Sequence, residues 1–176
     1  MNRILKLSII LCLVAFLPLN AQDISIYVNS NQGSLAGKNW ESGNRGGSMG
    51  LNFSHPIKHS YNYIVGSEIA LVPWGTNISA NLGVCYTKNI NTKWQYTVST
   101  LSNQGVALFR PKSLYVYGLS GLIGVDYKLT NKLSLGIQSG LKYYSCPSYK
   151  QYSLISSYLD IPIQIRLKRI LNIKKD

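Results

Sequence analysis

The sequence predicts an all-β fold class, an eight-stranded antiparallel up-and-down transmembrane β-barrel that follows an N-terminal signal peptide. Three observations lead to this prediction. Long segments alternate between apolar and polar residues, charged residues make up only 14% of the chain, and short polar connections alternate with longer ones. Soluble domains carry about 25% charged residues. Something other than charge must therefore solvate the exterior of this protein.

Residues 1–21 have the organisation of an export signal. Arg3 and Lys6 precede an apolar stretch from Leu7 to Phe16, and the segment closes on the small residue Ala21. A membrane-spanning helix is the competing interpretation, but this run is shorter than the ~20 residues that such a helix needs. We therefore expect a signal peptide at 1–21 and a single mature domain, the outer-membrane β-barrel, at 22–176.

The clearest strand is the segment 132–146. Leu135 and Ile137 face one side of it, and Ser134 and Gly136 face the other, which is the two-residue period of a half-buried strand. The same period recurs along the mature chain. The expected strands are 24–30, 47–56, 61–72, 77–87, 92–102, 113–129, 132–146 and 153–169.

The connections between these strands fall into two kinds. Short turns are expected at 57–60, 88–91 and 130–131, and longer loops at 31–46, 103–112 and 147–152, with 73–76 as a short exception among the latter. Transmembrane barrels have short periplasmic turns and longer outer loops. An even number of strands then leaves both termini in the periplasm.

The same alternation would fit a soluble barrel with an apolar interior, so the placement of aromatic residues and glycines decides between the two. Aromatic residues on the apolar faces are Phe53, Tyr61, Tyr63, Tyr86, Trp94, Tyr96 and Tyr127 near the short turns, and Tyr115, Tyr117 and Tyr143 near the loops. Two aromatic girdles around an aliphatic band are typical of a wall in lipid. Glycines gather on the polar faces, where a crowded lumen needs small residues. These features favour the outer membrane of a Gram-negative bacterium.

Two cysteines remain in the mature chain, Cys85 and Cys146. The expected strands place them near opposite ends of the wall, whereas a disulfide needs Cα atoms within about 7 Å. We expect no disulfide between them.

Part of the sequence resembles a known family. The segment 124–143, followed by Tyr158-Leu-Asp-Ile-Pro-Ile-Gln-Ile165, resembles the porin-like, PorT-type outer-membrane β-barrel family, and the segment Gly50–Ile57 resembles its early strand and turn. The resemblance implies an outer-membrane barrel, whose relatives range from structural barrels to secretion accessories. The chain departs from such barrels at its end, because Lys174-Lys175-Asp176 replaces the usual terminal aromatic residue.

The polar faces carry charged residues that would point into the lumen. We expect a lumenal charge network of Glu68, Asp126, Lys142, Asp160 and Arg166, because charges held away from bulk water need partners. Such a network would plug the barrel, and a conducting path is the alternative. Pro162 also faces inward, where it should weaken the ladder or mark a bulge.

No catalytic, metal or cofactor-binding residues are predicted. The only histidines, His55 and His59, flank a turn on the periplasmic side, and no zinc, triad, phosphate-loop or dinucleotide motif occurs. The expected outer-loop anion contacts are Lys38, Arg45, Arg110, Lys112 and Lys150. Cations there suit lipopolysaccharide. Nucleic acid is not an expected partner of an exported membrane protein, despite the sequence pI of about 9.7.

These observations predict a noncatalytic outer-membrane barrel, structural or accessory to envelope transport, secretion or assembly. Its expected partners are outer-membrane lipid, lipopolysaccharide and other envelope proteins. The alternative is a surface binding module that engages lipid or protein ligands through loops 31–46 and 103–112. A third hypothesis is an outer-membrane enzyme.

Overall fold

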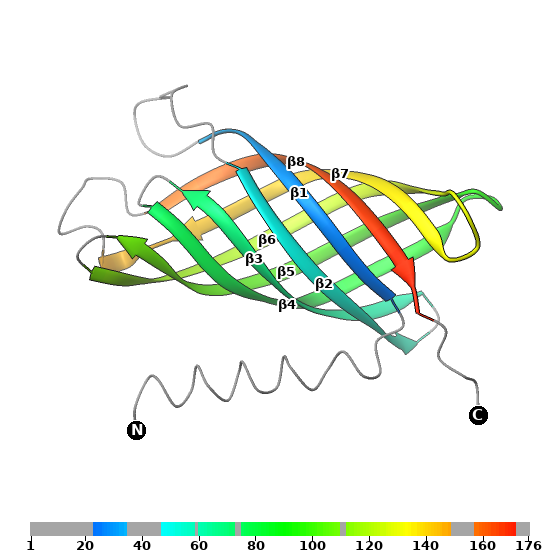
Figure 1. Ribbon diagram of the computed structural model, residues 1–176, viewed down its shortest axis with the longest axis horizontal. Helices are drawn as coiled ribbons and strands as arrows, with labels where there is room; N and C mark the ends of the chain where they lie inside the picture. The colour runs from blue at the N-terminus through cyan, green and yellow to red at the C-terminus, as the bar shows by residue number, and fades with distance from the viewer. Residues whose placement is uncertain are drawn as a thin grey trace.

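Eight antiparallel strands close into a barrel in the computed structural model (Figure 1). The strands are β1 (Asp23–Ser34), β2 (Gly47–Lys58), β3 (Tyr61–Val72), β4 (Gly75–Asn89), β5 (Trp94–Phe109), β6 (Lys112–Lys128), β7 (Leu133–Ser145) and β8 (Ser157–Ile170). The structure describes residues 23–34, 47–58, 60–72, 75–109, 112–148 and 157–171. The predicted signal peptide lies outside these ranges. Within them, no helix is long and apolar enough to cross a membrane.

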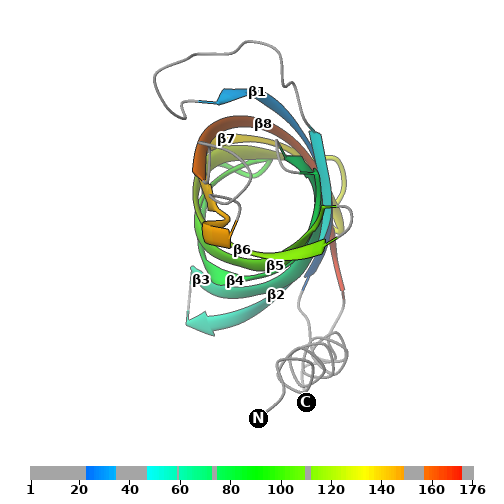
Figure 2. The ribbon, with the colours of Figure 1, turned by 90° about the vertical axis from the view of Figure 1, so that its left-hand side faces the viewer.

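Each strand pairs with its neighbours in the sequence, and β1 pairs with β8 to close the ring (Figure 2). In the closing ladder Ile26 lies opposite Leu167 and Val28 opposite Ile165. The connections after β2, β4 and β6 lie at the end of the barrel where β1 begins and β8 ends, which we call the turn end. The opposite end, where the connections after β1, β3, β5 and β7 lie, is the loop end. The up-and-down topology predicted from the sequence is confirmed.

The outer wall of the barrel is apolar and exposed. Ile123, Leu82 and Met49 expose 65%, 62% and 61% of their surface, and aliphatic residues of every strand share this orientation. The inward positions between them are buried and mostly polar. A soluble barrel would have the reverse arrangement, so lipid is the solvent that suits this wall.

Aromatic side chains border the aliphatic band at both ends. At the turn end, Trp94 contacts Tyr127 with ring centroids 4.9 Å apart, and Tyr61 contacts Tyr86 at 5.0 Å. At the loop end, Tyr115 and its neighbour Tyr117 lie 6.4 Å apart. Rings of this kind occupy the interfaces between membrane and water. The two predicted girdles therefore mark the two edges of the membrane.

The prediction of a loop at 103–112 is wrong. β5 continues to Phe109 and β6 begins at Lys112, so that residues 103–109 belong to a strand. The apolar face that identifies a strand is interrupted here, because Thr100, Ser102 and Gln104 take outward positions. The difference in length between turns and loops therefore rests on the connections after β1 and β7, since those after β3 and β5 are as short as turns.

Pro162 faces the lumen and interrupts both of its ladders, as predicted. The pairing of β1 with β8 shifts register between Asn31 and Ser34, opposite Pro162. The pairing of β7 with β8 stops at Ser139–Ile163 and resumes at Lys142–Asp160. A proline cannot donate to the ladder, which explains the local irregularity.

The two cysteines lie in different halves of the interior and are not disulfide-bonded, as expected. Cys85 packs with Ile64 and Leu101 in the half near the turn end. Cys146 packs in the half near the loop end. We call its surroundings the apolar cluster, which consists of Ala70, Ala107, Leu114, Val116, Tyr144 and Cys146.

Candidate functional site

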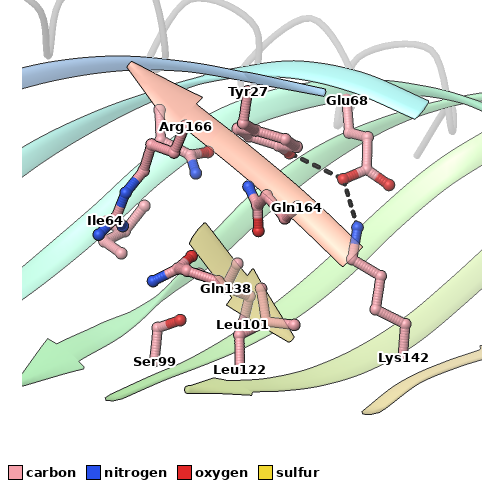
Figure 3. Close-up of a pocket in the computed structure, with 11 residues that line it drawn as sticks. Tyr27, Ile64, Glu68, Ser99, Leu101, Leu122, Gln138, Lys142, Gln164 and Arg166 are labelled. Atoms are coloured by element: carbon pink, nitrogen blue, oxygen red, sulfur yellow. Dashed lines mark hydrogen bonds and ion pairs between the residues drawn. The ribbon is translucent and has the colours of Figure 1, made fainter. Parts of the chain in front are cut away.

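The centre of the lumen holds a buried carboxylate with three donors. Lys142 Nζ lies 2.7 Å from Glu68 Oε2, and the hydroxyl of Tyr27 donates to the same oxygen at 2.8 Å (Figure 3). The hydroxyl of Tyr144 donates to Glu68 Oε1 at 2.6 Å. Glu68 exposes 1% of its surface. Both oxygens of the buried carboxylate therefore have partners, and one partner neutralises the charge.

A chain of hydrogen bonds reaches this carboxylate from the other wall. Ser120 donates to Asn103 at 2.9 Å, Asn103 donates to Asn81 at 2.7 Å, and Asn81 donates to the Tyr27 hydroxyl at 2.9 Å. Tyr27 in turn donates to Glu68. Every bond points toward the negative charge, an arrangement in which each donor polarises the next. We call these residues, with Lys142 and Tyr144, the Glu68 cluster.

A second charged group lies toward the turn end. Arg166 Nη2 contacts both oxygens of Asp126, at 2.7 and 2.6 Å. Lys168 Nζ lies 3.8 Å from Asp126 Oδ2 and 3.9 Å from Asp23 Oδ2. Arg166 also donates to Thr97 at 3.3 Å. We call this group the Asp126 cluster, and it is held by β1, β5, β6 and β8.

Glycines on intervening strands allow these side chains to meet. Gly136 of β7 lies in register between Asp126 of β6 and Arg166 of β8. A Cβ atom on Gly136 would collide with the Asp126 carboxylate. Adjacent strands lie about 4.8 Å apart, so partners two strands apart can bond over the middle strand only where it lacks a side chain.

The same device occurs twice more. Gly50 of β2 lies between Tyr27 and Glu68, and a Cβ atom there would collide with the Tyr27 ring. Gly124 of β6 lies in register between Thr97 and Gln138. The Gln138 amide donates to the Thr97 hydroxyl at 2.7 Å. Three interactions of the lumen therefore depend on a glycine that takes no part in them.

Little space remains between the two clusters. A cavity of about 10 Å³ is lined by Glu68, Lys142 and Gln138, and a cavity of about 20 Å³ lies next to Asp23 and Lys168. The mouth at the turn end is wider, with an open volume of about 470 Å³. An eight-stranded barrel encloses little more than its own side chains. These two narrow cavities are too small for a hydrated ion.

The structure brings four of the five residues of the predicted charge network together as two ion pairs. Glu68 lies with Lys142, and Asp126 lies with Arg166. Asp160 is buried on β8, opposite Lys142 in register. The residues of the two clusters that the predicted network did not include are Asp23, Tyr27, Asn81, Thr97, Asn103, Ser120, Tyr144 and Lys168. Their inward positions in the alternation were the signal that could have identified them.

The predicted outer-loop cations are placed differently. Lys38, Arg45, Arg110 and Lys150 lie outside the described residues. Lys112 does not lie in a loop, because it is the first residue of β6. The loop placement of Lys112 was wrong by one residue, because the strand predicted at 113–129 begins at Lys112. Its contact with an anion stays a prediction.

No metal site is found among the described residues. They contain no group of three or more His, Cys, Asp or Glu side chains that could hold a metal ion. His55 stacks on Tyr63, with ring centroids 4.7 Å apart and planes at 3°. This stacked imidazole is 4% exposed. His59 lies outside the described residues.

Comparison with solved structures identifies the fold. The barrel is similar to Neisserial surface protein A (NspA), with a TM-score of 0.61 and 10% identity over 86% of this chain and 98% of that one. Two weaker similarities are to a de novo designed transmembrane β-barrel (TM-score 0.46, 9% identity, 84% and 96% covered) and to the NanC porin (0.34, 8%, 85% and 100%). No protein-family model and no curated protein sequence matches the chain. The chain has the fold of an outer-membrane β-barrel.

Proposed function

We propose that this protein is a noncatalytic component of the outer membrane, structural or accessory to envelope transport, secretion or assembly, and that its barrel does not conduct solutes. One observation carries the proposal. The Glu68 cluster joins side chains from β1, β3, β4, β5, β6 and β7 across the middle of the lumen. A path along the barrel axis would have to cross this cluster.

The energy needed to open such a path supports the proposal. Moving Lys142 away from Glu68 leaves an unpaired buried charge, and breaking a buried ion pair in this way costs about 3–5 kcal/mol. The hydroxyls of Tyr27 and Tyr144 would have to leave the same carboxylate. Open states would therefore be rare, and a rigid membrane wall is the role that suits this interior.

Membrane placement follows from the exterior. The exposed aliphatic band and its aromatic borders fit a bilayer, and short turns are typical of the periplasmic side. With the turn end in the periplasm, the connections 35–46 and 146–156 reach the cell surface. We propose that the cations of these connections, Lys38, Arg45 and Lys150, contact lipopolysaccharide phosphates. Arg110, in the short connection after β5, is a fourth proposed contact.

A noncatalytic role is supported by how the reactive groups are used. The carboxylates of Glu68 and Asp126 are occupied by ion pairs in the interior, and His55 is stacked on Tyr63. A general base must reach a substrate, which these positions do not allow. The alternative, a surface binding module, loses one of its two predicted loops, because residues 103–109 are part of β5.

The resemblance to PorT-type barrels is the reason to propose an accessory role. The segments that carry it, 124–143 and 158–165, belong to β6, β7 and β8. The two segments include the buried inward residues Asp126, Lys142 and Asp160, so the resembling residues form part of the interior of the barrel. They support a barrel built in the same way as those of the PorT-type family. The accessory role assumes that this barrel, like some members of that family, also works with another envelope protein.

Two measurements test the proposal. Purified protein in planar bilayers should give no stable channel currents, with a general porin in the same bilayers as the positive control. Reproducible large currents would contradict the nonconducting barrel. Tagged protein extracted from its native membrane should copurify with one or more envelope proteins after cross-linking. Recovery of the protein with lipid alone would exclude the accessory role and leave the structural role.

A further inference from the structure

The β4–β5 and β6–β7 turns are closed by the same hydrogen bonds. In the first turn, Asn91 Oδ1 accepts from the backbone N–H of Lys93 at 2.9 Å and from that of the next residue at 2.8 Å. In the second, Thr130 Oγ1 accepts from Lys132 at 3.2 Å and from the next residue at 3.1 Å. The carbonyl group of each lysine accepts a backbone N–H of the neighbouring strand at 2.8 Å. Both turns are therefore fixed in position, with a lysine at the same place in each.

The three turns at this end also expose aliphatic side chains. Ile57, Ile90 and Leu129 expose 57%, 59% and 50% of their surface. Ile90 and Leu129 continue the outward alternation of Tyr86 and Tyr127, so they follow directly after the aromatic girdle of the turn end. Aromatic girdles lie at the level of the lipid headgroups. These aliphatic residues therefore lie at the edge of the bilayer, past the hydrocarbon that covers the wall.

Exposed cations accompany the aliphatic residues. We call them the rim cations, which are Lys58, Lys88, Lys93, Lys132 and Arg169. None of them is paired with a carboxylate among the described residues, whose ion pairs all lie on the lumen side. The acidic residues that the structure describes, Asp23, Glu68, Asp126 and Asp160, all take inward positions. The rim of the turn end therefore carries positive charge without a negative partner.

Apolar and aromatic residues of the outer wall lie beside the rim cations. Arg169 is in register between Ile24 of β1 and Leu133 of β7. Lys58 is in register with Tyr61. A long cationic side chain in such a place can lay its methylene groups along apolar surface and keep its charge among polar headgroups. The rim thus combines the two features that a lipid interface requires.

The distribution of the rim cations favours a lipid surface over a protein partner. They come from the turns after β2, β4 and β6 and from the end of β8, so they surround the barrel. A membrane contacts the barrel on all sides, whereas a protein bound to the wall would cover one side. Clustered lysine and arginine residues at a membrane surface attract anionic lipids. Charge complementarity therefore selects an anionic phospholipid.

We propose that the turn end binds the phosphate groups of anionic phospholipids through the rim cations, while Ile57, Ile90 and Leu129 insert between the headgroups. This contact lies at the opposite end of the barrel from the proposed lipopolysaccharide contacts and uses different residues. It fixes the depth of the barrel in the membrane. The inference does not rest on the proposed function, because it concerns how the barrel is held in lipid, whatever its role.

Spin-labelled lipids test the proposal with the purified protein. The barrel is reconstituted in phosphatidylcholine vesicles that contain traces of spin-labelled phosphatidylglycerol or phosphatidylcholine, and electron paramagnetic resonance gives the fraction of each label that the protein immobilises. We expect phosphatidylglycerol to be preferred several-fold, and the preference to weaken as salt is added, because mobile ions screen exposed charges. Replacing all five rim cations with glutamine should remove most of the preference.

Lys132→Gln and Lys128→Gln form a matched pair, because they remove the same charge from the two ends of one turn. Lys132 belongs to the rim. Lys128 lies in register with the buried Ser134 on the lumen side, and its Nζ donates to Asn89 Oδ1 at 3.0 Å. Lys132→Gln should lower the preference for phosphatidylglycerol, and Lys128→Gln should not.

The mobility of unheated samples on SDS gels verifies that each variant is folded. If the variant with five substitutions does not fold, the comparison of Lys132→Gln with Lys128→Gln decides alone. Equal immobilisation of the two lipids by the unmodified protein, or an unchanged preference in the folded variant with five substitutions, would overturn the proposal. Equal losses in Lys132→Gln and Lys128→Gln would also overturn it, because they would attribute the preference to net charge.

Discussion

Gly136 and Asp126 lie opposite each other in the β6–β7 ladder, and the Asp126 carboxylate occupies the space that a side chain on Gly136 would fill. Arg166 reaches Asp126 through the same space from β8. The glycine is therefore a requirement of the ion pair, although it takes no part in the chemistry. Glycine is needed here because it has no side chain to block the contact between Asp126 and Arg166.

This relationship predicts the effect of Gly136→Ala. The added methyl group must displace Asp126, and overpacking a tight interior costs about 1–3 kcal/mol. We expect the free energy of unfolding in lipid vesicles, measured by urea titration, to fall by this amount. Gly121→Ala is the matched control, because no atom lies within 4 Å of a Cβ atom at this outward glycine. Equal losses in the two variants would contradict the role of Gly136.

The central ion pair predicts non-additive energetics. Lys142→Met leaves Glu68 charged and without a cation, which should destabilise the barrel by about 3–5 kcal/mol. Adding Glu68→Gln removes the uncompensated charge, so the double variant should be more stable than Lys142→Met alone. A double-mutant cycle by urea titration measures the coupling. Additive losses would show that the two side chains do not interact in the folded state.

The apolar wall predicts a loss of stability that depends on depth. Ile123 projects outward from the middle of β6, and Leu129 projects from the turn end. Ile123→Arg should cost about 2–4 kcal/mol and Leu129→Arg about 0–1 kcal/mol, because the penalty for arginine falls toward the interface. The unfolding free energy in vesicles measures both. Similar values at the two positions would contradict the membrane placement of the wall.

Orientation in the membrane can be tested by thiol labelling of intact cells. In a variant with Cys85 and Cys146 replaced by serine, a membrane-impermeant reagent should modify cysteine introduced at Asn44, in the connection after β1. The same reagent should modify cysteine at Asn91, in the β4–β5 turn, only after the outer membrane is permeabilised. Labelling of intact cells at Asn91 but not at Asn44 would invert the topology.

The sequence was informative where its alternation was unbroken. Ile137 and Gly136 identified the two faces of β7, and the same parity placed Glu68, Asp126 and Arg166 in the lumen. It failed at the end of β5, where Ser102 and Gln104 face outward and imitate a loop. A strand whose outward residues are polar lacks the contrast on which this kind of prediction depends.

The partners in the lumen could not be predicted in the same way. Parity tells which face a residue takes, but the pairing of Lys142 with Glu68 depends on barrel closure, which brings β3 and β7 to opposite walls of one narrow lumen. The grouping of six charged residues into two clusters depends on strand stagger, which no local pattern contains. Glycines were expected on the polar faces because a crowded lumen needs small residues. The register shows a more specific reason, since Gly50 and Gly136 each lie between two residues that bond over them.

The sequence separations within the Glu68 cluster have a consequence for folding. Tyr27, Lys142 and Tyr144 lie 41, 74 and 76 residues from Glu68, yet all three bond to its carboxylate. Neighbouring hairpins can form early, but these contacts require strands from both ends of the chain to be in place. The interior would then be completed only as the first and last strands join. A half-assembled barrel would carry its charges in contact with water, and their desolvation would mark the final step of assembly.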